Sequence, residues 1–193
     1  EADLAFRAGR MPGIGDTISG SGFQFGPGGK GSNQSVAAAR AGADVTFISR
    51  LGTDDFGRIA LSTWKAEGIT ARVAESADQP TGAAFIYVND KNGENAIIVV
   101  PGACFEVTTA EVDRARELIA ASAIFVAQLE LSIPVVEHGL ALAFALDVPT
   151  ILNPAPAQPL TASIYRHIDY ITPNETETTA LTGIPVSSLA DAE

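Results

Sequence analysis

A glycine-rich stretch from Gly26 to Asn33 holds the residues whose types and spacing point most directly to chemistry. Its glycines permit backbone angles that a β-carbon forbids, so a ligand can approach the main chain closely. Lys30 adds a movable cation, and Asn33 adds an amide that both donates and accepts hydrogen bonds. Because an alanine-rich helix is expected to follow, the amide hydrogens of its first turn also point toward the loop. The stretch therefore predicts a site for a polyhydroxylated or anionic small molecule.

Two known phosphate-binding loops compete with this interpretation. A P-loop needs Ser or Thr after its Gly-Lys pair, but Gly31 follows Lys30, so that motif is excluded. The dinucleotide fingerprint does fit by letter at Gly26, Gly28 and Gly31. Arg50, at the end of the next apolar run, could then accept the 2'-phosphate of NADP. An NADP site and a plain surface turn ahead of a helix therefore both stay open at this point.

Further polar side chains stand where three expected strands end. Glu130 follows the strand expected at 123–127, Asn153 follows the strand at 150–152, and the segment from Asn174 to Glu177 follows the strand at 168–172. The carboxyl ends of parallel strands meet at one edge of a sheet, where ligands bind in such folds. We expect these groups to converge on that edge, although Glu130 alone would also suit a solvated helix start.

The pair Asn174 and Glu177 has two readings. Spaced by three residues at a helix start, the two side chains share the first turn, where they could hold Mg²⁺ through bound water. The same spacing makes a capping box, in which Asn174 caps the turn and Glu177 reaches back to its amide. By spacing alone the capping box is favoured.

The composition narrows the class of protein. The 193 residues carry a formal net charge of −11, which argues against nucleic acid and against an anionic membrane as the main partner. The longest apolar region, 139–152, is too short to span a bilayer. The single cysteine, Cys104, cannot form an intrachain disulfide, so a cytoplasmic location is expected.

The elements that must position these residues alternate between strands and helices, which predicts an α/β fold with a parallel sheet. Residues 84–88 and 96–100 are β-rich runs joined by a polar turn containing glycine, which is typical of a hairpin. We assign this hairpin to the same small sheet as the N-terminal strands, although it could also extend the main sheet. The expected division has a small sheet of residues 1–27 and 80–101, and an α/β core of residues 28–79 and 102–193.

The other expected elements are short. They are strands at 3–7, 16–25, 45–49, 123–127, 150–152 and 168–172, and helices at 33–41, 54–67, 109–121, 133–146 and 174–182.

The run from Gly28 to Asn33, with Gly42 and Gly52 downstream, resembles the first signature of the ribokinase family of sugar and nucleoside kinases. The likeness extends from Asp3 to the region of Ile184, and the segment from Asn174 to Glu177 is similar to the family's Asn-x-x-Glu motif. The resemblance implies a three-layer core with a parallel central sheet and a small discontinuous β-sheet lid.

The resemblance also implies roles for single residues. The residues expected to bind the sugar hydroxyls are Asp3, Gly29, Lys30, Asn33 and Glu130. The resemblance places Asn174 near ATP and Glu177 near Mg²⁺, through water, and it implies a monovalent cation, K⁺. The expected reaction transfers the γ-phosphate of ATP to the 5-hydroxyl of D-ribose, and the expected assembly is a homodimer through the β lid.

The family's second signature, which supplies the catalytic Asp, is not found in this sequence, so no catalytic residue is assigned and residues 1–193 alone are expected to be inactive. Alternatives are a kinase for another sugar or a nucleoside, an NADP-binding oxidoreductase, and a non-catalytic sugar-binding module. The kinase interpretation requires Lys30 and Glu130 to face one pocket.

Overall fold

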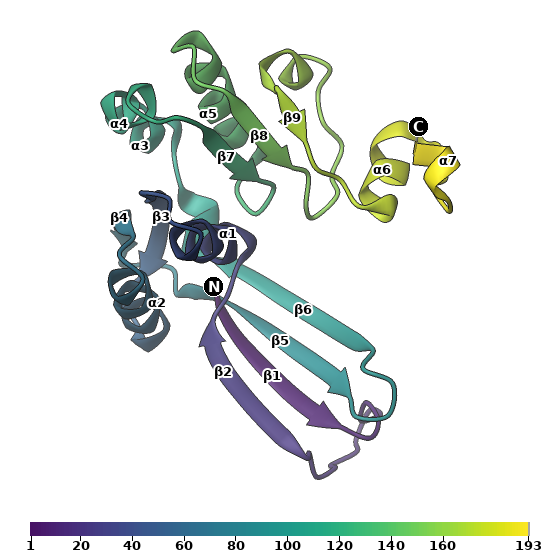
Figure 1. Ribbon diagram of the computed structural model, residues 1–193. Helices are drawn as coiled ribbons and strands as arrows, with labels where there is room; N and C mark the ends of the chain where they lie inside the picture. Colours follow the sequence, from purple (N-terminus) through teal and green to yellow (C-terminus); the bar gives the residue numbers. More distant parts are fainter. Residues whose placement is uncertain (193) are drawn as a thin grey trace. The chain divides into compact units, whose positions relative to one another are not determined.

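The computed structural model describes residues 1–192, which divide into a first unit of residues 1–104 and a second unit that begins at residue 105 (Figure 1). Each unit has its own buried apolar cluster. Trp64 and Leu51 centre the cluster of the first unit, and Leu140 and Leu152 centre that of the second. None of the helices between residues 1 and 192 is long and apolar enough to cross a bilayer.

The first unit contains two sheets and two helices. Its elements are β1 (Ala2–Ala8), β2 (Gly22–Pro27), α1 (Lys30–Arg40), β3 (Thr46–Gly52), α2 (Asp55–Ala66), β4 (Thr70–Ser76), β5 (Thr81–Asn89) and β6 (Asn95–Gly102). The four-stranded sheet has the order β2-β1-β5-β6 and is the predicted small sheet, a name kept below, and β3 pairs with β4 in the other. The predicted hairpin and the N-terminal strands therefore share one sheet, as expected.

The small sheet contains both parallel and antiparallel strand pairs. β1 pairs antiparallel with β2 and parallel with β5, so Asp3 lies opposite Gly26 on one side and Ala84 on the other. β5 and β6 form the antiparallel hairpin, whose turn is closed by Asn89 Oδ1 accepting from the Lys91 amide at 2.9 Å and by Gly93 with φ +75°. Such a conformation suits glycine, which has no β-carbon to clash.

Several elements of this unit differ from the prediction, among them β2, α1 and β4. β2 begins at Gly22 rather than at residue 16, because the residues after β1 form a loop in which Asp16 bonds to Arg10 and to the Gly13 amide. Helix α1 begins at Lys30, three residues before the predicted start. Strand β4 was not predicted at all, and it pairs parallel with β3 from Thr70 onward.

The second unit is built on a parallel three-stranded sheet in the order β7-β8-β9. Its elements are α3 (Thr109–Arg114), α4 (Arg116–Ala120), β7 (Phe125–Gln128), α5 (Ile133–Ala145), β8 (Thr150–Asn153), the 3-10 helix η2 (Ile164–His167), β9 (Tyr170–Ile171), α6 (Glu175–Thr182) and α7 (Leu189–Ala192), with a further 3-10 helix, η1 (Ala103–Glu106), at the boundary with the first unit. The parallel direction confirms the alternating pattern, whereas the single helix predicted at 109–121 is broken into α3 and α4 at Ala115.

Candidate functional site

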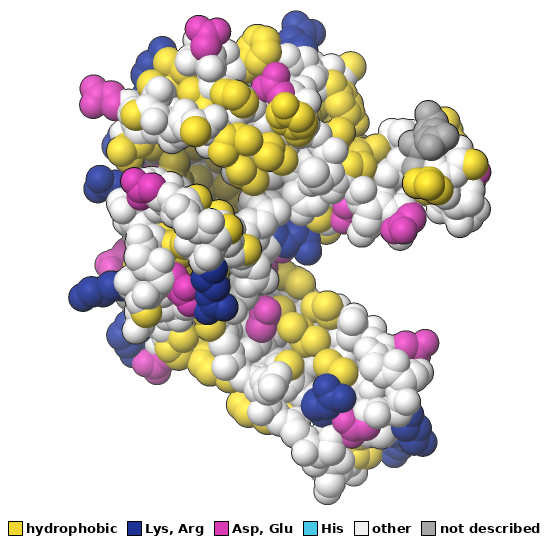
Figure 2. All heavy atoms as spheres, in the orientation of Figure 1, with side chains coloured by type: hydrophobic (Ala, Val, Ile, Leu, Met, Phe, Trp, Pro, Cys, Tyr) yellow, Lys and Arg dark blue, Asp and Glu magenta, His cyan; other side chains and the backbone are white. Residues whose placement is uncertain are grey.

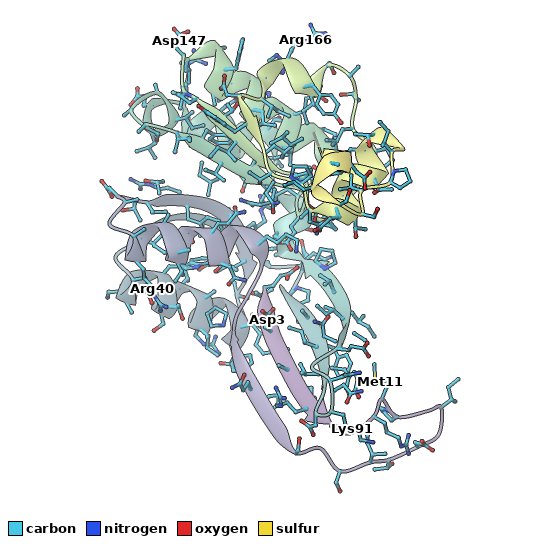
Figure 3. All side chains as sticks on the ribbon, turned by 45° about the vertical axis from the view of Figure 1, so that its right-hand side comes forward. Asp3, Met11, Arg40, Lys91, Asp147 and Arg166 are labelled. Atoms are coloured by element: carbon cyan, nitrogen blue, oxygen red, sulfur yellow. The ribbon has the colours of Figure 1, made fainter. Side chains whose placement is uncertain are left out.

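Asp3 lies on β1 at the end of the small sheet where β2 leads into α1, and Met11 and Lys91 mark the opposite end of the same sheet (Figure 3). Gly28 closes over it, because a β-carbon at Gly28 would lie 2.0 Å from Asp3 Oδ1. The Gly28 amide donates to the carbonyl of Glu1 at 2.9 Å, which continues the β1–β2 pairing up to the glycines. Glycine is thus required at this position for the Asp3 carboxyl to occupy its place.

A pocket of about 490 Å³ opens beside Asp3 on one face of the small sheet. It is lined by Asp3, Ala5, Gln24, Phe25, Gly26 and Ile86. Burial raises the pKa of Asp3 above its usual value, and nearby positive charge, including that of Lys30, opposes this effect. The pocket therefore combines one partly desolvated carboxyl with an amide and with apolar walls, which suits a ligand that has both hydroxyl groups and carbon faces.

The residues after Gly28 are fixed by the start of α1. Gly29 has φ +89° and precedes the helix without any side-chain cap, and its carbonyl accepts from the Asn33 amide at 2.9 Å. Ser32 is buried and accepts a hydrogen bond from Trp64 Nε1 at 2.9 Å, which ties the first turn of α1 to α2. Lys30 and Asn33 are thereby held on a turn whose position depends on the core of this unit.

The structure brings some of the predicted residues together within the first unit. Asp3 lines the pocket, and Lys30 interacts electrostatically with it, while Gly29 and Asn33 belong to the adjoining helix start. Gln24 and Ile86 also line the pocket, and the sequence argument did not identify them. Their alternation within β2 and β5 shows which face they share, but only the register of the strands places them beside Asp3.

In the second unit, the ends of the three parallel strands lie beside one another, and the convergence of Glu130 with the start of α6 stays a prediction. Gln128 at the end of β7 lies opposite Asn153 at the end of β8, and Asn153 Nδ2 donates to the Thr172 carbonyl after β9 at 3.0 Å. Glu130 follows two residues after Gln128, and the intervening Leu129 amide bonds to Ala155 at 2.9 Å. Lys30 belongs to the first unit and Glu130 to the second, so the expectation that they face one pocket stays a prediction.

The start of α6 forms the capping box. Asn174 Oδ1 accepts from the Glu177 amide at 2.8 Å, and Glu177 Oε2 accepts from the Asn174 amide at 2.9 Å. Both bonds are exposed, and each residue retains a second polar side-chain atom. Mg²⁺ prefers oxygen ligands with several bound waters, so one carboxylate here fits a water-mediated role. Within residues 1–192 there is no group of three or more His, Cys, Asp or Glu side chains that could hold a metal ion.

Comparison with known proteins adds the relationship. The model of the family described as pfkB family carbohydrate kinase matches residues 3–193. The chain is 41% identical to a ribokinase of Haemophilus influenzae over 90% of this chain and 56% of that protein. It is 34% identical to a deoxyribokinase of Salmonella typhi over 96% of this chain and 61% of that protein.

Solved structures agree with the sequence relatives. The structure of Arabidopsis thaliana ribokinase complexed with ribose and ATP superimposes with a TM-score of 0.88 at 29% identity, covering 98% of this chain and 62% of that one. The chain thus spans little more than half the length of these relatives. Its fold is the ribokinase-like α/β fold with a small additional sheet, and the chain belongs to the pfkB family of carbohydrate kinases.

Proposed function

We propose that the complete protein transfers the γ-phosphate of ATP to the 5-hydroxyl of D-ribose. The observation that carries this proposal is the Asp3 carboxyl beside an open pocket, closed over by Gly28 immediately before the α1 turn that bears Lys30 and Asn33. Membership of a carbohydrate kinase family supports it over an NADP-binding oxidoreductase. A relative named ribokinase and a neighbour complexed with ribose and ATP support the choice of sugar.

Each residue has a role in holding the sugar. Asp3 accepts hydrogen bonds from two neighbouring hydroxyls, and Lys30 and Asn33 add donors from the start of α1. Gly29 lets the sugar approach the main chain, and the family resemblance implies that Glu130 is a second sugar-binding carboxylate. Both carboxylates act as holders rather than as bases, because phosphoryl transfer depends chiefly on positioning and on charge neutralisation.

The nucleotide end of the site uses the start of α6. Asn174 contacts ATP through Nδ2, the side-chain atom that the capping box does not use. Glu177 binds a water molecule of the Mg²⁺ ion. Mg²⁺ supplies charge neutralisation between the phosphates when it is bound. A role for K⁺, and the absence of turnover by residues 1–193 alone, are further proposals that follow from the family resemblance.

A sugar panel with Mg-ATP tests this proposal, using protein expressed from its entire reading frame. D-ribose, 2-deoxy-D-ribose, D-fructose and adenosine are compared for the wild type, Lys30→Ala, Asn33→Ala and the control Lys91→Ala in the hairpin turn. We expect D-ribose to give the highest kcat/KM, with a loss of about tenfold or more for the first two variants and none for the control. Preference for another acceptor would overturn the choice of sugar, and ribose binding without any ATP consumption would indicate a sugar-binding module.

We also propose a homodimer through the small sheet. β6 is an edge strand, and its four central residues Ile97, Ile98, Val99 and Val100 are between 48% and 64% exposed. Figure 2 shows hydrophobic side chains gathered over β5 and β6 on the visible face. Exposed apolar edge strands are sites of protein association.

The cytoplasmic location expected from the lone cysteine stays a prediction.

Sedimentation velocity tests the dimer. Ile98→Lys places a charge on the exposed strand and should shift the protein to monomers, whereas Leu189→Lys, at an exposed position of the second unit, should not. A wild-type protein that sediments as a monomer at every concentration would rule the dimer out.

A further inference from the structure

The Asp54 carboxyl joins three elements of the first unit. Oδ1 accepts from the Gly57 amide in the first turn of α2 at 2.9 Å, and Oδ2 accepts from the Thr81 amide at the start of β5 at 2.7 Å. The Thr81 hydroxyl in turn accepts from the Gly52 amide at the end of β3 at 3.0 Å. We name this group, made of Gly52, Asp54, Gly57 and Thr81, the Asp54 clamp.

Close packing surrounds the clamp. A β-carbon on Gly57 would lie 2.4 Å from the Gly52 carbonyl oxygen, and one on Gly52 would lie 2.6 Å from the Thr81 nitrogen. The facing position on β6 is equally tight, because Gly102 pairs with Thr81 and a β-carbon on Gly102 would lie 2.4 Å from the Pro80 carbonyl oxygen. The open end of the β5–β6 hairpin is therefore packed closely against backbone.

A helix cap alone does not account for this arrangement. An N-terminal cap needs one side-chain oxygen, which Asp54 provides through Oδ1. The second oxygen holds the first residue of β5, a separate element, and Thr81 is only 3% exposed. Burial alone would raise the pKa of Asp54, but the hydrogen bonds from Gly57 and Thr81 together lower it below its ordinary value, so the carboxylate stays charged in the clamp.

The clamp lies in register with the sugar pocket. Thr81 is three residues before Ala84, which pairs directly with Asp3, and Ile86 farther along β5 lines the pocket. We propose that Asp54 is a positioning residue that fixes β5, and through β5 the Asp3 carboxyl and the pocket wall, for sugar binding. The link to sugar binding rests on the proposed function, whereas the fastening of the hairpin does not.

Two variants of Asp54 separate the cap from the clamp. Asp54→Ser retains one oxygen for the Gly57 amide but has none to reach Thr81, and Asp54→Asn keeps the shape of the side chain while placing an N–H against a donor. Asp55→Asn is the matched control, because Asp55 is an exposed neighbour that pairs only with Arg58 among the contacts described.

Hydrogen exchange and kinetics on protein from the entire reading frame then decide the matter. We expect both Asp54 variants to raise the exchange rate of the β5 amides by roughly tenfold while the α5 amides are unchanged, and the control to behave as wild type. KM for the sugar should rise severalfold with KM for ATP unchanged, a separation that general destabilisation would not produce. Unchanged β5 exchange would overturn the clamp, and equal rises in both KM values would overturn the positioning role. If the wild type phosphorylates no sugar, the proposed function fails, while the exchange data still settle whether Asp54 fastens the hairpin.

Discussion

The pocket beside Asp3 and the start of α6 hold their carboxylates in contrasting ways. Asp3 is partly buried, faces an open pocket and has its pKa raised by burial. Glu177 is used by the helix itself, since one of its oxygens accepts from the Asn174 amide. A partly buried carboxyl that takes no part in a helix cap is available to a ligand. A carboxyl that accepts a capping hydrogen bond has a structural role first. This contrast ranks the candidate residues by how directly a ligand can use them.

Removing the Asp3 carboxyl should have the largest effect. Asp3→Ala removes the two hydrogen bonds to hydroxyls that the proposed function assigns to Asp3, and bonds to a charged group contribute about 1.5–3 kcal/mol each, so KM for the sugar should rise by roughly a hundredfold or more. Steady-state kinetics measure this, with thermal unfolding as a check on folding. The control Asp90→Asn lies at the far end of the sheet, where Asp90 pairs with Arg7. An unchanged KM in Asp3→Ala would remove Asp3 from the site.

Filling the space over Asp3 should have the next largest effect. The β-carbon of Gly28→Ala would displace the Asp3 carboxyl, so we expect the sugar affinity to fall by about tenfold. Gly9→Ala is the control, because Gly9 does not line the pocket and its β-carbon would meet nothing within 4 Å. Isothermal titration with the sugar compares the two variants. Equal losses would show that contact with Asp3 is not what Gly28 governs.

The start of α6 offers a smaller and more selective test. Glu177→Gln keeps an oxygen for the capping box but removes the charge, so the helix should persist while the Mg²⁺ concentration for half-maximal activity rises about threefold. Glu177→Ala also loses the cap, at a cost of about 1 kcal/mol in local helix stability. The control is Glu175→Gln in the same turn. If Glu177→Gln leaves the Mg²⁺ requirement unchanged, the pair has only its capping role.

Acid should produce the smallest effect, of about twofold at the midpoint. The protonated carboxyl cannot accept from two hydroxyls, and burial places the pKa of Asp3 above its ordinary value of 3.8. Sugar affinity should therefore be complete near neutral pH and decline as the pH falls through a midpoint above 3.8. Binding measured between about pH 7 and about pH 3 checks this, and Asp3→Asn should give a flat profile. A midpoint below 3.8 would contradict the desolvation of Asp3.

Local sequence patterns predicted most of the helices and strands. The β5–β6 hairpin follows from β-branched runs around a turn with Gly93, and the capping box at Asn174 follows from spacing alone. β4 was missed because its seven residues include Arg72 and Glu75, and the short run lacks the apolar pattern of a buried strand. β4 is stabilised as a strand by its hydrogen bonds to β3, and no local sequence pattern predicts that pairing.

Candidate site residues could be predicted only where they belong to a local sequence motif. Lys30 and Asn33 stand in a recognisable loop, but the pocket wall at Gln24 and Ile86 depends on which strands become neighbours. The second bond of Asp54, to the Thr81 amide, has the same origin. A sequence reveals the faces of strands and the caps of helices, whereas contacts between distant segments depend on the tertiary fold.

The parallel pairing of β1 with β5 has a consequence for biosynthesis. These central strands are roughly eighty residues apart in sequence, so β1 must wait on the ribosome until five intervening elements have been made. Non-local pairings of this kind slow folding, and during the delay Phe6, which packs against Phe23, lacks its other aromatic neighbour Phe85. The nascent first unit should therefore be a client of chaperones that shield apolar segments.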